Sequence, residues 1–420
     1  MCYHCLAEES FIMKQERTFP RSTVTKKQEN RIKDGHPWVY EDEIIEASEN
    51  IENGALVDVF SQKGNYLGTG FWSETSKIRI RILDRNANEK FEDSFFARRV
   101  KYAVQYRYDI MGKDVQACRM IHGEADGLPG LTVDRYNDIL VCEVLSYGTE
   151  QKKHVIYKAL VDEIGAHGET INGIYERNEG ELRKKENLPQ YQGWYEDLGL
   201  NHPDQCLTMI SENGILYNVD YENGQKTGFF LDQKYNRLAI HGIAKGRTVL
   251  DCCTHTGSFA LNAAKAGARH VTAVDISDTA LHTAKANAAL NHLEDSIDFV
   301  QADMMEYLPK LLAEHAGYDF IILDPPAFTK SRKTFEHARS GYRKINTLAM
   351  RLLPRGGYLA TASCSHFMPT EEFRQMLKEA GKDAGVSVRV IEERHAAPDH
   401  PVILSIPETD YLKFFLVQII

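Results

Sequence analysis

The sequence predicts an α/β protein whose C-terminal half is a parallel, doubly wound sheet. From residue 248 onward, strand-like and helix-like segments alternate, which is typical of such a sheet. The chain then reaches two further strands, at 386–392 and 411–417, with no strong helix between them. Short strands separated by turn residues predict a β-rich domain over 17–91. Residues 92–210 mix both patterns and are interpreted as a central α/β domain.

The N-terminal 1–16 are interpreted as a tail, and the β-rich domain that follows is predicted from three strands. These strands are expected at 56–60, 66–71 and 77–83, where glycine and asparagine turns separate them. In the last strand three isoleucines alternate with Arg79 and Arg81. One face of this strand is therefore predicted to be apolar and the other basic.

The central domain is predicted to contain two helices and at least two strands. Helices are expected at 94–111 and 152–164, and strands at 139–144 and 173–177. Residues 123–136 are interpreted as a turn-rich segment and 178–188 as a charged loop.

The third domain, 211–420, begins with an alternating stretch, 215–221, that lies between Asn213-Gly214 and Asn223-Gly224. Such turns favour β-hairpins. Strands are then predicted at 248–253, 270–275, 297–301, 320–323 and 358–362, and helices at 259–266, 277–290, 304–314, 342–352 and 371–384. With its terminal antiparallel pair, this order is characteristic of the Rossmann-like sheet of class I S-adenosylmethionine-dependent methyltransferases rather than of dinucleotide dehydrogenases.

The composition is that of an ordinary globular protein of 420 residues with a net charge of −10. No run of about 18 apolar residues predicts a membrane span, and the N-terminus lacks the pattern of a secretion signal. The eight cysteines are scattered, which is typical of reduced thiols in a cytoplasmic protein. Cys2 and Cys5 have metal-ligand spacing, but no second pair stands nearby, so no metal site is predicted.

The net negative charge counts against an all-over basic nucleic-acid binder, so any such contact must come from local patches. Three basic patches are present: residues 21–33, residues 79–85 with 98–101, and residues 330–333 with 339–344. Each is either a solvated face or a nucleic-acid contact.

The turn at 249–257 (VLDCCTHTG) has the features of a cofactor-binding turn. Asp251 ends a predicted strand and Gly257 begins the next helix, where ligands of open α/β sheets bind. Gly257 lets the backbone approach a ligand, while Thr254 and Thr256 keep the turn polar. The turn is not the glycine fingerprint of dinucleotide-binding proteins, and we interpret it as the cradle of S-adenosylmethionine.

Two further acids follow the next two strands. Asp275 is placed to bind both ribose hydroxyls, and Asp303 to bind the adenine amino group. Their neighbours Ile276 and Met304 are assigned to the same pocket. The simpler interpretation of each aspartate is helix capping, which suits Asp303 better than Asp275.

The loop at 322–328 (ILDPPAF) is predicted to hold a flat, amide-like ring. Pro325 and Pro326 make the loop rigid, Phe328 can stack on a base, and Asp324 can meet the N–H edge of the ring. Among the basic residues that follow, Lys330 and Arg332 are predicted to guide a nucleic-acid backbone to the loop. The alternative is an ordinary exit from a strand.

Cys364, in the segment 361–365 (TASCS), suggests nucleophilic catalysis. Carbon 5 of cytosine is a poor nucleophile until a thiolate adds to carbon 6, and Asp324 would then stabilise the ring at nitrogen 3. We expect the surroundings of Cys364 to lower its pKa. A buried, inert thiol is the alternative; Cys252 and Cys253 are interpreted as core residues. His366, as a strand neighbour, is a weaker candidate for a catalytic role.

These motifs together resemble those of the RlmI-type family of bacterial 23S ribosomal RNA cytosine-C5 methyltransferases. The resemblance covers nearly the whole chain after residue 17, and includes 35–40 (GHPWVY), 123–136 (GEADGLPGLTVDRY), 226–233 (KTGFFLDQ) and 399–405 (DHPVILS). It implies an N-terminal PUA domain that binds RNA, a homodimer, and a cofactor pocket lined also by Phe230, Asp232 and Gln233. Lys234 departs from the usual arginine. Ala327 stands where many other RNA cytosine-C5 enzymes have a second cysteine, and the resembled family also lacks that cysteine.

The sequence thus predicts an S-adenosylmethionine-dependent RNA methyltransferase that forms 5-methylcytosine in 23S ribosomal RNA. Two alternatives remain open. Asp-Pro-Pro-aromatic loops also serve methyl transfer to exocyclic amino groups such as guanine N2, which needs no cysteine. A non-catalytic RNA-binding factor of ribosome assembly would keep the cofactor site without turnover, although the intact Asp251, Asp275, Asp324 and Cys364 argue against it.

Overall fold

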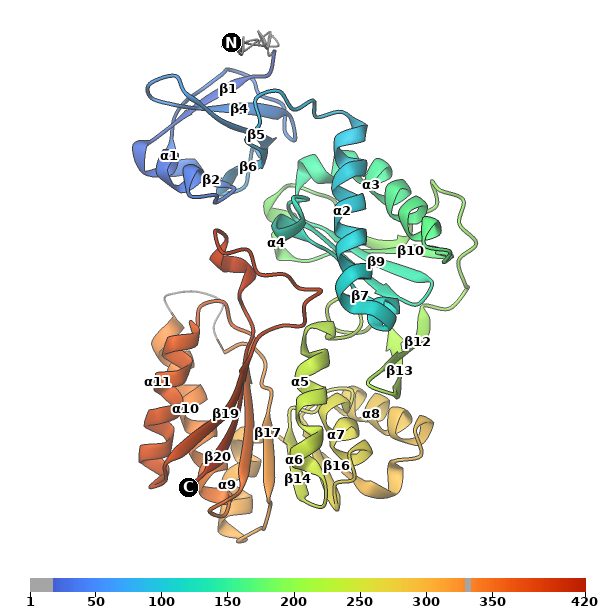
Figure 1. Cartoon of the computed structure of the whole chain (residues 1–420), viewed down its shortest axis with the longest axis vertical. Helices are drawn as coiled ribbons and strands as arrows, with labels where there is room; N and C mark the ends of the chain where they lie inside the picture. The colour runs from blue at the N-terminus through green and yellow to red at the C-terminus, as the bar shows by residue number, and fades with distance from the viewer. Residues whose placement is uncertain (1–17, 329–333) are drawn as a thin grey trace, which may run out of the picture.

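The computed structural model describes residues 18–328 and 334–420, so the predicted tail with Cys2 and Cys5, as well as Lys330 and Arg332, lies outside the described residues. Three sheets and a separate hairpin follow one another along the chain (Figure 1). In the described residues, no helix is long and apolar enough to cross a membrane. The α/β fold class predicted from the sequence is confirmed.

The N-terminal sheet has six strands in the order β2-β6-β5-β4-β1-β3. The predicted strands correspond to β4 (Leu56–Ser61), β5 (Tyr66–Trp72) and β6 (Ile78–Asp84). Their inward side chains pack with helix α1 (Lys26–Lys33) around a small core that includes Val57 and Ile80. Helix α1 was not predicted from the sequence, and neither were the short strands β1 (Arg21–Val24), β2 (Trp38–Tyr40) and β3 (Ile44–Ala47).

The basic side of β6 is not a free surface, contrary to one interpretation of the sequence. Arg81 is buried and donates to Glu186 at 2.9 Å, across the boundary with the central domain. Arg79 is buried too, and its guanidinium pairs with Glu41 at 2.6 Å. Both arginines are therefore engaged in ion pairs within the chain and are not available to a nucleic acid.

The central sheet has five strands in the order β11-β10-β9-β8-β7. Its elements are α2 (Asp93–Met111), β7 (Ala117–His122), β8 (Leu131–Tyr136), β9 (Ile139–Val144), α3 (Tyr147–Ala166), β10 (Gly173–Asn178), α4 (Glu181–Lys185) and β11 (Tyr191–Trp194). Two interpretations were partly wrong. Half of the turn-rich segment is strand β8, which pairs with β7 and β9. The charged loop contains helix α4, whose buried Arg183 donates to the Val144 carbonyl.

A hairpin follows the central sheet and leads into the C-terminal domain. Strands β12 (Leu207–Glu212) and β13 (Ile215–Asp220) are joined by Asn213-Gly214, both with positive φ, as predicted. The second turn, Asn223-Gly224, does not form a hairpin. Asp220 instead accepts hydrogen bonds from the backbone N–H groups of the turn, and the chain proceeds to the short helices α5 (Lys234–Ala239) and α6 (His241–Ala244).

The C-terminal sheet has seven strands in the order β16-β15-β14-β17-β18-β20-β19. Strands β14 (Thr248–Cys252), β15 (His270–Asp275), β16 (Ile297–Gln301), β17 (Phe320–Leu323) and β18 (Tyr358–Ser363) are parallel. Strand β20 (Lys413–Ile419) runs antiparallel to both β18 and β19 (Val388–Arg394). The predicted doubly wound sheet with a terminal antiparallel pair is therefore confirmed.

Helices cover both faces of this sheet because its strands are apolar on both sides. Helices α7 (Ser258–Lys265) and α8 (Asp278–Leu290) pack on one face with residues such as Val249 and Val271. On the other face, α9 (Met304–Ala313), α10 (Phe335–Leu352) and α11 (Thr370–Ala384) pack on Leu250 and Ile321.

The segment between β19 and β20, residues 395–412, reaches all three domains, and we call it the bridging loop. Figure 1 shows it in red, rising from the C-terminal sheet toward the other two domains. Its Glu408 lies 3.1 Å from His36 of the N-terminal domain. Its Asp399 accepts hydrogen bonds from the Arg107 side chain and the Arg119 backbone of the central domain, at 2.9 and 2.8 Å.

A buried ion pair fixes the start of α5 to the hairpin. Arg237 donates through two nitrogens to the carboxylate of Glu212, at 2.6 and 2.8 Å, and both side chains are almost fully buried. We expect Glu212→Gln to lower the free energy of unfolding by roughly 3–5 kcal/mol, because it leaves a buried guanidinium unpaired. Chemical denaturation measures this. Asp162→Asn, which breaks the exposed pair with Lys158, is the control and should change little.

Candidate active site

Parallel strands bring the predicted acids together at one edge of the C-terminal sheet. Strand β14 lies between β15 and β17, where the strand order reverses, and such switch points are the usual ligand sites of open α/β sheets. Asp251, Asp275 and Asp324 stand at the carboxyl ends of these three strands, and Cys364 follows the next strand, β18.

The turn after β14 has polar atoms that no described residue satisfies. Asp251 is buried, and one of its oxygens accepts a hydrogen bond from the Thr254 hydroxyl at 2.6 Å. Its other oxygen and the buried Thr256 hydroxyl have no hydrogen-bond partner among the described residues. Burial raises the pKa of Asp251 to about 8, and the charges of Asp324 and Asp275 contribute. Buried polar atoms without partners indicate a place for a polar ligand.

Gly257 begins α7 with a positive φ of 84°. A Cβ atom there would lie 3.0 Å from Cβ of Ala284 in α8. The glycine is therefore required by the backbone conformation and by close helix packing. Its predicted closeness to a ligand remains a prediction.

Asp303 is a helix cap and Asp275 is not, as the sequence suggested. Asp275 accepts one backbone N–H from His255 at 2.8 Å and one from Ser277 at 2.9 Å, and the cap of α8 is Ser277 itself. Asp303 is the cap of α9 and accepts the N–H of Met305 at 2.7 Å. Both carboxylates keep unused acceptor capacity.

Apolar side chains stand beside these acids. Ile276 is exposed to 66%, unusually high for an isoleucine, directly after Asp275. Met304 is buried, with its sulfur 3.9 Å from the Cys253 sulfur. Cys252 is a core residue as predicted, but Cys253 is not fully buried and has a positive φ of 62°. Burial raises the pKa of Cys253, and the charges of four nearby aspartates contribute to the rise.

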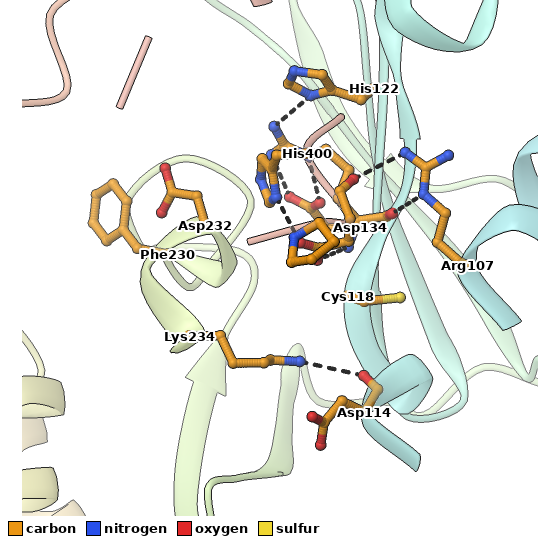
Figure 2. Close-up of polar contacts among 12 residues, drawn as sticks. Arg107, Asp114, Cys118, His122, Asp134, Phe230, Asp232, Lys234 and His400 are labelled. Carbon is orange, nitrogen blue, oxygen red and sulfur yellow. Dashed lines mark hydrogen bonds and ion pairs between the residues drawn. The ribbon is translucent and has the colours of Figure 1, made fainter. Parts of the chain in front are cut away.

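The segment before α5 extends the same site. Phe230 packs edge-on against His255 at 5.3 Å, and Figure 2 shows Phe230 and Asp232 side by side. Asp232 accepts a hydrogen bond from Tyr411 of the bridging loop at 2.6 Å. Its other oxygen is buried and has no partner among the described residues. Gln233 donates to Asp324 at 3.1 Å and so connects this segment to the Asp-Pro-Pro loop.

Asp324 is a carboxyl group with a strongly shifted pKa. Burial raises the pKa of Asp324 to about 7, and the nearby charge of Asp232 adds to the rise. After it, Pro325 is buried and Pro326 exposed. The Phe328 ring packs against Tyr342, with 4.5 Å between ring centroids, so part of its surface is already covered.

Cys364 lies in the turn after β18, half-buried. Burial, together with the carboxylates of Asp324 and Asp232, raises the pKa of its thiol to about 11, and Lys226 partly opposes this rise. The expectation that the surroundings lower this pKa was wrong, because burial and the carboxylates near Cys364 both disfavour the thiolate. His366 lies beyond the strand and is exposed, so it is not a strand neighbour of Cys364.

A polar network at the junction of the central and C-terminal domains was not identified from the sequence (Figure 2). Arg119 donates through two nitrogens to Asp134, both at 2.8 Å, and Asp399 pairs with His400. Lys234, the departure from the family pattern, is fully buried and donates to the carbonyls of Asp114 and Ala117. Two carbonyl acceptors suit an ammonium, so the lysine fits its site.

The third basic patch is largely neutralised where the structure describes it. Arg339 pairs with Glu379 at 2.6 Å, and Arg343 pairs with Asp383 at 2.6 Å on the neighbouring helix α11. The predicted contacts Lys330 and Arg332 remain outside the described residues.

The chain is similar to known methyltransferases along almost all of its length. A PUA-like domain model matches residues 23–85, and an S-adenosylmethionine-dependent methyltransferase model matches residues 200–414. "Ribosomal RNA large subunit methyltransferase I" of Pseudoalteromonas atlantica is 38% identical over 95% of this chain and 99% of its own length. The protein of that name from Yersinia pseudotuberculosis is 37% identical, with the same coverage of both chains.

Solved structures agree in fold. A structure described as a SAM-dependent methyltransferase from Streptococcus mutans has a TM-score of 0.80 at 22% identity, and covers 95% of this chain and 99% of its own. A structure of a methyltransferase complexed with SAH gives the same values. The partnerless buried oxygens of Asp232, Asp251 and Thr256 fit a polar cofactor of this kind.

Proposed function

The chain belongs to the S-adenosylmethionine-dependent methyltransferase family of ribosomal RNA large subunit methyltransferase I, and from this we propose that it methylates carbon 5 of a cytosine in 23S ribosomal RNA. The family resemblance inferred from the motifs is confirmed. The observation that carries the proposed chemistry is the convergence of Asp324 and Cys364 on one sheet edge, where the charge of Asp324 raises the pKa of Cys364.

The residues at the sheet edge fit the cofactor as follows. The carboxylate of Asp275 would hold the ribose hydroxyls, and Ile276 would cover the adenine, with Asp303 and Met304 at its rim. The remaining pocket residues would enclose the amino-acid part and the sulfur: Phe230, Asp232, Gln233, Asp251, Thr254, Thr256 and Gly257. When bound, S-adenosylmethionine supplies an electrophilic methyl group.

Cys364 and Asp324 would perform the chemistry on the base. The thiolate of Cys364 adds to carbon 6 of cytosine, while the protonated carboxyl of Asp324 donates to nitrogen 3. The electron pair reaches carbon 5, which would take the methyl group as the methyl–sulfur bond of the cofactor breaks and S-adenosylhomocysteine leaves. Loss of the carbon 5 proton to a base then expels the thiolate and restores the aromatic ring. Pro325, Pro326 and Phe328 would form the wall against which the base rests.

The pKa shifts of the two groups are consistent with this sequence of steps. With a pKa of about 7, Asp324 is readily protonated near neutral pH. Protonation removes the negative charge that raises the pKa of Cys364, so a neutral Asp324 favours the thiolate. Binding of the base to the neutral carboxyl therefore activates the nucleophile.

RNA would approach across the N-terminal PUA-like domain and a polar hollow beside the site. This hollow of about 360 Å³ is lined by Glu143, Arg177 and Lys226, among others. Lys226 is exposed, and its charge acts on Cys364, so it lies where the neighbours of a flipped-out base must pass. Lys330 and Arg332 are proposed to add contacts to the RNA backbone.

We expect Lys226→Ala to raise the KM for RNA by roughly tenfold, because a phosphate contact is lost. The effect should shrink as salt is added, and cofactor affinity should stay unchanged. Steady-state kinetics at two salt concentrations measure this. Lys245→Ala, an exposed lysine just before the opposite end of β14, is the control. An equal effect of both variants would contradict a specific contact.

Methyl transfer from labelled S-adenosylmethionine to unmodified large-subunit ribosomal RNA, followed by nucleoside analysis, tests the function. Label in 5-methylcytosine is expected. Label in an N2-methylguanine would support amino methylation, and absence of transfer to free RNA and to assembly particles would support a non-catalytic role. We further propose that the protein works in the cytoplasm, on free RNA or an early assembly particle, as a homodimer.

A further inference from the structure

Lys413 is a buried lysine that binds the segment carrying Cys364. It begins β20 and lies opposite Ser363 in the register of β18 and β20. Its ammonium donates to the carbonyl of Ser365 at 2.6 Å and to that of Tyr411 at 2.8 Å. The side chain is almost fully buried. No carboxylate within the described ranges forms an ion pair with it.

Burying an ammonium without a carboxylate is unfavourable, and an apolar side chain of similar length would fill the space at lower cost. The position of the charge gives it a role. The turn 363–366 carries Cys364, and Lys413 holds this turn by the carbonyl of the residue that follows the cysteine. The same ammonium holds the carbonyl of Tyr411, whose hydroxyl binds Asp232. One cation thus connects the nucleophile turn with the cofactor pocket.

We propose that Lys413 is a positioning residue for methyl transfer: it fixes the turn that carries Cys364 and places a positive charge near the thiol. The proposal rests on the proposed role of Cys364 as nucleophile. It explains how a thiol that faces two carboxylates can still be ionised when substrate binds.

The charges near Cys364 and Lys413 determine how readily the thiol ionises. Asp324 and Asp232 oppose the thiolate, whereas Lys226 favours it from the outer side. The charges of Asp410 and of an ionised Cys364 in turn favour the charged form of Lys413. Burial lowers the pKa of Lys413 to about 8, so the cation is present at neutral pH and is lost as the pH rises through 8.

The test is the rate at which iodoacetamide alkylates Cys364 in the full-length protein, followed by peptide mass spectrometry from pH 6.5 to 10. Removing the cation in Lys413→Met should slow alkylation roughly tenfold at pH 7.5, because a nearby charge shifts a thiol pKa by about one unit. Lys413→Arg should keep the wild-type rate at pH 7.5. Above pH 8 it should alkylate faster than wild type, since its charge persists there.

Lys234→Met is the matched control, because Lys234 is equally buried and also bound to two carbonyls. It should lower the melting temperature but leave the alkylation profile unchanged. If Lys413→Met does not fold, the alkylation rate of Lys413→Arg above pH 8 tests the proposal by itself. A rate faster than that of the wild type supports the proposal. Unchanged profiles in the folded Lys413 variants would overturn the proposal. An error in the proposed function would give a different result: methyl transfer would survive the loss of Cys364.

Discussion

Cys364→Ala is expected to lose methyl transfer almost completely, with kcat falling by roughly 10⁴-fold or more, the scale on which removal of a nucleophile acts. Without a sulfur that adds to carbon 6, carbon 5 of cytosine stays unreactive. Cofactor binding should be retained, because the partnerless oxygens that fit the cofactor belong to Asp232, Asp251 and Thr256. Methyl transfer to ribosomal RNA and calorimetric titration with S-adenosylmethionine measure the two effects separately.

The matched control is Cys206→Ala. Cys206 is another free, half-buried cysteine, but it lies just before β12. It should retain wild-type activity. Methyl transfer that survives in Cys364→Ala or Cys364→Ser would contradict the covalent mechanism and support amino methylation, which needs no thiol.

Asp324→Asn is expected to lower kcat by roughly 10²–10⁴-fold, the contribution of a positioned acid or base. The amide can donate a hydrogen bond to nitrogen 3 but cannot transfer a proton. The same substitution removes the negative charge beside Cys364, so the thiol pKa should fall and alkylation at pH 7.5 should become faster. Slower methylation together with faster alkylation is the signature to look for.

Asp298→Asn serves as the control for this experiment, since Asp298 is an exposed acid of β16 paired with His270. Neither rate should change in this variant. Slower alkylation in Asp324→Asn would mean that the carboxylate assists the thiol directly, for example as its base, and would contradict the electrostatic coupling described above.

Local patterns predicted most of the fold. Strands such as β9 and β15 were predicted at the bounds that the structure has, because their apolar residues and flanking turns lie within a few positions. The strands β1 and β3 have only four residues each and depend on partners far along the chain. No local pattern identifies such strands.

In the candidate site, too, some residues could be predicted from local patterns and others depend on contacts far along the chain. Asp251 and Asp275 lie at the carboxyl ends of parallel strands and Cys364 directly follows one, so topology alone brings them together. Lys413 approaches the site through the antiparallel register of β20 against β18, and Tyr411 through the bridging loop that precedes β20. The direction of the Cys364 pKa shift was also missed, since it depends on burial and on carboxylates from distant parts of the chain.

The bridging loop has a consequence for how the protein melts. The N-terminal and C-terminal sheets each have an apolar core of their own, and independent cores would normally unfold one after another. Two larger apolar cores, however, contain residues of neighbouring domains. Residues such as Asp399 and Glu408 connect them through a segment of the C-terminal domain, so loss of that domain removes contacts from both neighbours. The architecture therefore favours a single cooperative transition, in which the RNA-facing domain and the catalytic sheet are gained and lost together.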